Sequence, residues 1–294
     1  MRPASSLVLA LALASALSAC AATDGGAPDS AGQLSVATGF YPYEFVAARV
    51  AGPDAQVTNL TEPGGEPHDL ELTPQQVAAL RDTDLVVYSR GFQPAVDEAV
   101  DQQAADRAFD VLTAVDLRSG QAGQQDDPHV WLDPDRLAII ATAVAEQLAG
   151  RTPERADAFR DRARALTREL KALDQQLTDG LATCERKQIV TSHDAFGYLA
   201  GAYGLEQVSI AGLSPDDEAS PQRLAEVAQL AREQGVTTIF FEDLVSPKVA
   251  ESLAREVGAQ AVVLSPLEGA PDDGDYLTAM RENLATLRTA LGCT

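Results

Sequence analysis

The sequence predicts an α/β protein with two lobes, each built on a parallel sheet flanked by helices, and a long rigid helix that joins them. Short runs of apolar and β-branched residues alternate with stretches of helical periodicity, which is typical of parallel sheets. The alternation occurs in two separate sets, and this predicts two lobes. Between the two sets lies the strongest helical pattern of the chain.

The first lobe is expected over residues 34–150. Its strands are predicted at residues 34–40, 57–60, 85–89 and 109–112. Its helices are predicted at residues 43–50, 74–82, 92–103 and from Pro134 onward. The regular alternation of strand and helix favours parallel pairing within this lobe.

The linking helix is expected over residues 151–183, with Thr152 as its N-cap and Pro153 at its first helical position. Apolar residues recur at spacings of three or four and form one stripe: Phe159, Ala163, Leu166, Leu170, Leu173, Leu177 and Leu181. From Pro153 to Leu181, the end of the stripe, the helix should be about 40 Å long at 1.5 Å per residue. A stiff connection of this kind implies that the lobes open and close only slightly.

The second lobe is expected over residues 184–294. Its strands are predicted at residues 188–192, 207–210, 237–242 and 261–264. Its helices are predicted at residues 195–203, 221–234, 247–257 and 275–291. The order of elements repeats that of the first lobe.

The first nineteen residues have the layout of a secretory signal, with Arg2 before an apolar stretch at residues 7–17. This stretch is shorter than the roughly 20 apolar residues of a membrane-spanning helix. Residues 17–20, Leu-Ser-Ala-Cys, resemble a bacterial lipobox, so Cys20 is expected to carry lipid and to anchor the chain at the outer face of the membrane. The alternative is an ordinary signal peptidase site with a free Cys20. Residues 20–33, rich in Gly, Ala and Ser, should be a flexible tether.

The chain is strongly acidic, with a formal net charge of −22. Removal of residues 1–19 removes one positive charge, that of Arg2, which gives −22 − 1 = −23. A nucleic-acid partner is not expected, because phosphate binding needs a basic surface. An acidic surface suits a cationic ligand, although solubility alone also accounts for it.

Two cysteines, Cys184 and Cys293, remain after Cys20. In an exported, oxidising compartment we expect them to form a disulfide. A bridge that closes a loop of this size stabilises the fold by roughly 4–5 kcal/mol in the chain-entropy model. The alternative is two separate thiols.

The three histidines of the chain are the strongest functional signal. His68, His129 and His193 each follow a predicted strand, two of them follow Pro, and two are followed by Asp. Ligands of open parallel sheets bind beyond the carboxyl ends of the strands, so the three imidazoles can converge between the lobes. Imidazole is a preferred zinc ligand, and a zinc site needs three or four ligands with bonds of about 2.0–2.1 Å. If the three histidines are ligands, a fourth ligand should be an oxygen.

Several longer motifs carry a resemblance to a known family. PHDLELTP and DPHVWLDP are highly specific, and TSHDAFGYLAGAYGL, LSPLEG and the terminal LGC support them. Over residues 34–293 the chain resembles the cluster A-I (cluster 9) solute-binding proteins of zinc and manganese ABC importers. The resemblance implies two α/β lobes with the metal between them, three histidine ligands at His68, His129 and His193, an ABC permease as partner, and a monomer.

The fourth ligand is less clearly marked, because family members use Asp, Glu or water there. In LSPLEG the candidates are Ser265 and Glu268, and we expect Glu268. Glu242 and Asp243 compete for the same place. Glu242 could instead accept a hydrogen bond from a ligand imidazole and so orient the ring.

Three imidazoles and one carboxylate favour Zn(II) as the transported ligand over Mn(II), which prefers more oxygen ligands. A manganese-binding importer component remains the closest alternative. A zinc-dependent hydrolase is a second one, but no His-Glu-x-x-His motif is present and the resembling family is not enzymatic. An adhesion or sensor protein would need an extensive exposed apolar patch, which this aromatic-poor sequence does not indicate.

Overall fold

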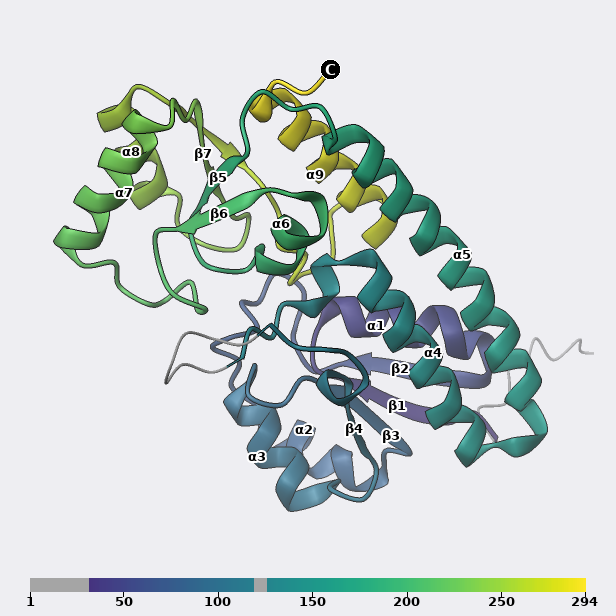
Figure 1. Ribbon diagram of the computed structural model, residues 1–294. Helices are drawn as coiled ribbons and strands as arrows, with labels where there is room; N and C mark the ends of the chain where they lie inside the picture. The colour runs from purple at the N-terminus through teal and green to yellow at the C-terminus, as the bar shows by residue number, and fades with distance from the viewer. Residues whose placement is uncertain (1–31, 119–125) are drawn as a thin grey trace, which may run out of the picture. The chain divides into compact units, whose positions relative to one another are not determined.

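The computed structural model describes residues 32–118 and 126–294 (Figure 1). The signal segment, nearly all of the expected tether and Cys20 lie outside the described residues. Residues 33–294 pack as one unit, and the two lobes are parts of it. The expected fold class, two parallel sheets with flanking helices and a long helix between them, is confirmed.

The first lobe contains a four-stranded parallel sheet in the order β2-β1-β3-β4. Its strands are β1 (Leu34–Thr38), β2 (Ala55–Asn59), β3 (Leu85–Tyr88) and β4 (Ala108–Asp110). Its helices are α1 (Tyr41–Ala51), α2 (Pro74–Ala79), α3 (Pro94–Gln103) and α4 (Pro134–Arg151). Short 3-10 turns occupy Gly52–Asp54, Leu80–Asp82, Val111–Ala114 and Val130–Leu132. The predicted strand at residues 109–112 is thus shorter, because its second half turns into a 3-10 helix capped by Asp110.

The second lobe repeats this topology, with the parallel order β6-β5-β7-β8. Its strands are β5 (Gln188–Thr191), β6 (Glu206–Ser209), β7 (Thr238–Phe241) and β8 (Gln260–Val263). Its helices are α6 (Gly197–Tyr203), α7 (Pro221–Glu233), α8 (Lys248–Val257) and α9 (Tyr276–Leu291). In both sheets the first strand in sequence is an interior one, so the loops that follow it leave from the middle of the sheet.

The linking helix α5 spans Ala156–Leu181, 26 residues or about 39 Å. All seven residues of the predicted apolar stripe are buried. The predicted start of this helix was wrong. Thr152 makes no side-chain capping hydrogen bond among the described residues, and its backbone N–H instead bonds Leu148 and ends α4. A 3-10 turn at Pro153–Arg155 then precedes α5.

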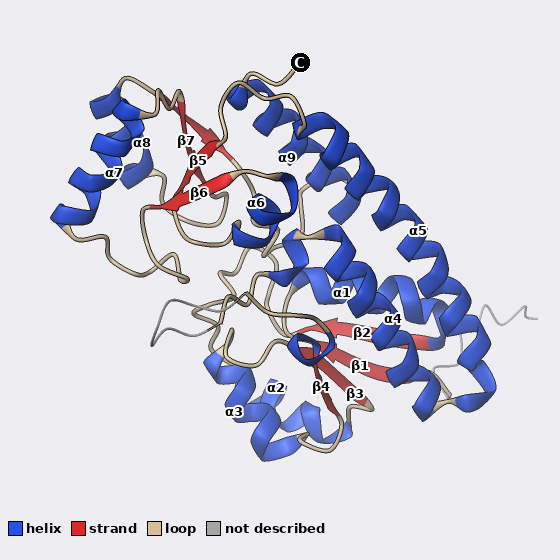
Figure 2. Cartoon of the chain, viewed as in Figure 1, coloured by secondary structure: helices blue, strands red, loops and turns tan. Residues whose placement is uncertain are grey.

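The connection between the lobes is a layer of helices. The long helix α5 packs along α4 and α1 in the first lobe and along α9 in the second (Figure 2). One continuous apolar core includes Phe40 and Trp131 of the first lobe and Phe240 and Tyr276 of the second. A shared core of this kind opposes wide separation of the lobes, since truncation of a single buried Leu in such a core costs about 2–5 kcal/mol.

Cys184 and Cys293 form the predicted disulfide. The two residues also pair as an isolated antiparallel bridge, and the backbone N–H of Thr294 donates to the carbonyl of Thr183 at 3.2 Å. The disulfide therefore joins the end of α5 to the end of α9. Among the helices of the described residues, none is both long and apolar enough to cross a membrane.

Candidate metal centre

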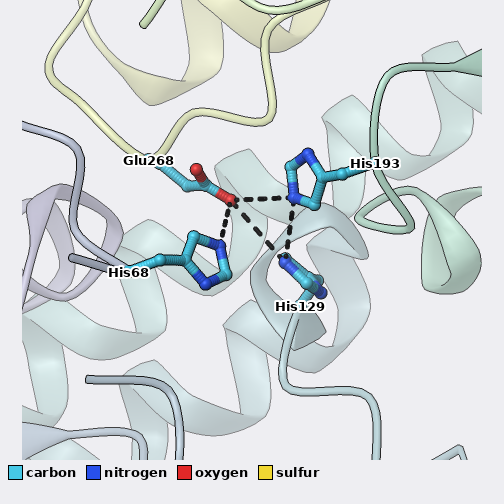
Figure 3. Close-up of side chains that lie close together, drawn as sticks. All are labelled: His68, His129, His193 and Glu268. Carbon is cyan, nitrogen blue, oxygen red and sulfur yellow. Dashed lines mark hydrogen bonds and ion pairs between the residues drawn. The ribbon is translucent and has the colours of Figure 1, made fainter. Parts of the chain in front are cut away.

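Four side chains from separate loops converge between the lobes. His68 follows β2, His129 precedes α4, His193 follows β5 and Glu268 follows β8 (Figure 3). Their potential ligand atoms all lie within 4.8 Å of one another. Glu268 Oε1 lies 3.4 Å from His68 Nε2, 3.6 Å from His129 Nε2 and 3.5 Å from His193 Nε2, and the last two nitrogens are 3.4 Å apart.

These distances match the edges of a small coordination tetrahedron. With ligand bonds of about 2.0–2.1 Å, two ligands of a tetrahedral ion are about 3.3–3.4 Å apart. Within the described part of the chain, His68 Nε2 and both oxygens of Glu268 are buried without a hydrogen-bond partner. Each unpaired buried polar group costs about 1–3 kcal/mol. A shared cation would satisfy them together, so the arrangement fits one tetrahedral metal ion.

His129 is oriented by the carboxylate two residues before it. Asp127 Oδ1 accepts hydrogen bonds from the backbone N–H of His129 at 3.0 Å and from its ring Nδ1 at 2.8 Å. This leaves the lone pair of Nε2 directed at the cluster, as in other carboxylate-histidine-metal arrangements. Burial lowers the pKa of His129, although Asp127 opposes the effect. Asp127 is not among the site residues predicted from the sequence, although the Asp-Pro-His triplet is a signal for it.

His68 is also preceded by a carboxylate two residues earlier, but that carboxylate bonds the backbone of His68. Glu66 Oε1 accepts a hydrogen bond from the backbone N–H of His68 at 2.9 Å, and the rings of His68 and Phe92 pack in a T-shaped arrangement with their centroids 4.3 Å apart. The other oxygen of Glu66 is buried and has no hydrogen-bond partner among the described residues. Burial, and then the charge of Glu268, raises the pKa of Glu66 to about 7. Glu66 was also absent from the sequence interpretation, and Glu-Pro-His is its signal.

His193 lies two residues beyond the end of β5, and its ring is held by Glu242 from the end of β7. Glu242 Oε1 accepts from His193 Nδ1 at 2.6 Å, and the hydroxyl of Ser192 contacts the same oxygen. Glu242 thus accepts a hydrogen bond from a ring of the cluster and does not itself belong to the cluster of four. Burial opposes protonation, but the hydrogen bond with Glu242 and the negative charge of nearby Glu268 raise the pKa of His193 to about 10.

Glu268 reaches the cluster from a turn with unusual backbone geometry. Leu267 has φ of 59°, the single positive value among the non-glycine residues that the structure describes. This left-handed conformation costs about 1–2 kcal/mol for an L-residue. Although burial favours the neutral acid, His193 and His68 hold the pKa of Glu268 well below its usual range.

The other candidates for the fourth ligand, Ser265 and Asp243, hydrogen-bond each other. Ser265 Oγ lies 3.2 Å from Asp243 Oδ2, and Ser265 also exchanges two hydrogen bonds with Asn283. Among the His, Cys, Asp and Glu side chains that the structure describes, the group that could hold a metal includes Glu268 and not Asp243. Among these candidates, Glu268 is the one whose carboxylate lies with the three histidines.

Comparisons with known proteins agree with this geometry. The chain matches the family of zinc-uptake complex component A, periplasmic (ZnuA), over residues 36–290. It is 35% identical over 288 residues to the zinc-binding protein AdcA of Streptococcus pyogenes serotype M6, which covers 87% of this chain and 56% of AdcA. This chain thus spans little more than half the length of that relative.

Two further relatives match over nearly their whole length. The high-affinity zinc uptake system protein ZnuA of Bacillus subtilis is 34% identical over 292 residues, which is 92% of this chain and 91% of the relative. The laminin binding protein Lmb of Streptococcus agalactiae, described as a bifunctional protein with adhesin and metal transporting activity, superposes with a TM-score of 0.82 at 33% identity, over 88% of this chain and 99% of that one. As the motifs predicted, the chain belongs to the zinc-uptake complex component A (ZnuA) family.

Proposed function

We propose that this protein captures one Zn(II) ion outside the cytoplasm through His68, His129, His193 and Glu268 and delivers it to an ABC importer. The observation that carries the proposal is the set of four distances of 3.4–3.6 Å between potential ligand atoms. The zinc-related names of AdcA and of the Bacillus relative support the same ligand.

The composition of the cluster supports Zn(II) rather than Mn(II). Three imidazole nitrogens and one carboxylate are a common zinc set, whereas Mn(II) favours more oxygen ligands and a higher coordination number. The nearby carboxylates Glu242 and Asp127 hydrogen-bond the outer ring nitrogens of two histidines, so they tune the imidazoles instead of adding oxygen ligands.

In this proposal the protein is a carrier and not an enzyme. A catalytic zinc keeps one coordination position open for water. Here Glu268 Oε1 lies at nearly equal distances from all three imidazole nitrogens, which favours a closed four-ligand site. The partners in this account are an ABC permease and, through a lipid on Cys20, the outer face of the membrane, with the protein acting as a monomer.

The proposal is tested by metal competition. The metal-free full chain is equilibrated with equimolar Zn(II) and Mn(II), dialysed and analysed for both elements. We expect one retained zinc and no manganese per chain, and a clear loss of zinc in Glu268→Ala. The matched control is Glu282→Ala, which removes an exposed glutamate of α9 and should retain zinc like the wild type. Retention of manganese, or of neither metal, by the wild type would overturn the proposal.

A further inference from the structure

Trp131 links the segment that carries His129 to the segment that carries Glu268. Its indole Nε1–H donates to the carbonyl of Pro266 at 2.7 Å, and its own carbonyl accepts from the hydroxyl of Tyr276 at 2.6 Å. Trp131 and Tyr276 are both fully buried. Two hydrogen bonds out of contact with solvent therefore cross from the first lobe to the second at this point.

The Pro266 carbonyl belongs to the peptide group that immediately precedes Leu267, whose φ is 59°. Leu267 in turn precedes Glu268. The turn is held on its other side by Asn283, which bonds both the N–H and the carbonyl of Ser265, and by the Ser265 hydroxyl, which accepts from Leu267 N–H at 3.2 Å. Those contacts come from the second lobe, whereas the bond to the Pro266 carbonyl comes from the first.

We propose that Trp131 is a positioning residue for Glu268. Its N–H holds the Pro266 carbonyl, keeps Leu267 in the left-handed conformation and so fixes Glu268 Oε1 against the imidazole nitrogens of the first lobe. This inference rests on the proposed zinc capture and deepens it. A carboxylate held in this way suits a small tetrahedral ion and resists the rearrangement that a metal with more oxygen ligands requires. Trp131 therefore contributes to selectivity for zinc without touching the ion.

The aromatic body of Trp131 has a separate, structural role. Its ring packs against Phe40, Phe92 and His129 at centroid distances of 4.7, 5.2 and 5.1 Å. Loss of the whole side chain would disturb this cluster and the fold. The test must therefore remove the N–H donor and keep an aromatic ring in place.

The first test is a double-mutant cycle between Trp131→Phe and Glu268→Ala in the full chain, with zinc affinity measured by competition against a chromophoric chelator. We expect Trp131→Phe to weaken zinc binding about tenfold, the lower end for loss of a group that orients a metal ligand, and to reduce the preference for zinc over manganese. In the Glu268→Ala background the same change should have no further effect. An equal loss in both backgrounds, or no loss in either, would overturn the inference.

The matched control is Tyr43→Phe. Tyr43 belongs to the same buried aromatic cluster, and its hydroxyl bonds Ser89 and not the turn before Glu268. We expect this variant to lose stability as Trp131→Phe does while it keeps the zinc affinity of the wild type. An equal loss of affinity in Tyr43→Phe would assign the effect to general loosening of the core and contradict a positioning role.

A second measurement holds even where Trp131→Phe folds poorly. Trp131 is the single tryptophan of the sequence, so incorporation of a tryptophan analogue with sulfur in place of the indole N–H alters this position alone. The analogue keeps the shape of the ring and removes the donor. We expect the same loss of zinc affinity and of selectivity, and unchanged values would refute the inference. Failure of the unmodified protein to bind zinc would instead refute the proposed function.

Discussion

Glu66-Pro67-His68 and Asp127-Pro128-His129 share a local sequence pattern, but they hold their imidazoles differently. Asp127 bonds both the backbone and the ring of His129, and the hydroxyl of Tyr198 in the second lobe donates to the Asp127 carbonyl at 2.9 Å. Glu66 is bonded to the backbone of His68. A triplet of carboxylate, Pro and His can therefore fix a ligand ring completely or leave part of its orientation to the metal.

The largest effects are expected from loss of an imidazole. Structural zinc sites with four ligands bind with about 10–16 kcal/mol, so one ligand accounts for about 3 kcal/mol, or roughly 100-fold in affinity. His68→Ala and His129→Ala should both show a loss of this size in chelator competition. If either variant binds zinc like the wild type, that histidine is not a ligand.

The same two variants should differ in stability. His129 is fully buried, and its loss leaves Asp127 with one hydrogen bond fewer, whereas His68 lies nearer the surface. We expect metal-free His129→Ala to lose about 2 kcal/mol or more of unfolding free energy and His68→Ala to lose less, as measured by chemical denaturation. Equal losses would remove the distinction between the two triplets.

Intermediate effects are expected from the carboxylates. Asp127→Asn removes the charge that orients the His129 ring and should weaken zinc binding about tenfold. Glu66→Gln should weaken zinc binding by no more than about threefold, because Glu66 bonds the backbone of His68 and not its ring. A hydrogen bond of this kind contributes a net of about 0.5–1.5 kcal/mol. The pKa of Glu66, raised to about 7, also makes the neutral amide a close mimic. A larger loss in Glu66→Gln than in Asp127→Asn would reverse the comparison.

The smallest effect concerns protons and contrasts His129 with His193. Burial lowers the pKa of His129, so in the metal-free protein its ring is neutral at pH 7.5, whereas the pKa of His193 is raised to about 10 and its ring holds a proton. Zinc needs the unprotonated nitrogen, so binding should release about one proton, from His193. Calorimetry in buffers of different ionisation enthalpy measures this number.

A matched variant identifies the source of that proton. Glu242→Gln removes the carboxylate that raises the pKa of His193, so the number of protons released at pH 7.5 should fall below that of the wild type. The isosteric Glu282→Gln on α9 changes an exposed carboxylate and should leave the number unchanged. Proton release that is the same in Glu242→Gln as in the wild type would point to another group.

Much of the fold and three members of the cluster could be predicted from local sequence. Strand and helix alternation is a short-range pattern, and each histidine follows a recognisable stretch such as Asp-Pro-His. The start of the linking helix could not be predicted, because Thr152 has the sequence of an N-cap but is used by the preceding helix α4 as its end. Local propensity allows Thr152 either to begin the linking helix or to end α4, and the packing of α4 along α5 decides between the two roles.

The fourth member of the cluster was harder to predict, for a physical reason. The sequence near Glu268 leaves Ser265 as a competitor, and the direction of this turn depends on Leu267 in a left-handed conformation that local propensity disfavours. That conformation is supported by Trp131, more than 130 residues earlier in the chain. A long-range contact of this kind leaves no local pattern.

The most direct test of the account is the coordination of the bound ion. X-ray absorption at the zinc edge, on the full chain loaded with one equivalent of Zn(II), reports the number and type of ligands. We predict four ligands at about 2.0–2.1 Å, three of them imidazoles and one an oxygen, with one fewer imidazole in His68→Ala. Five or six ligands, or fewer than three imidazoles in the wild type, would contradict the proposed site.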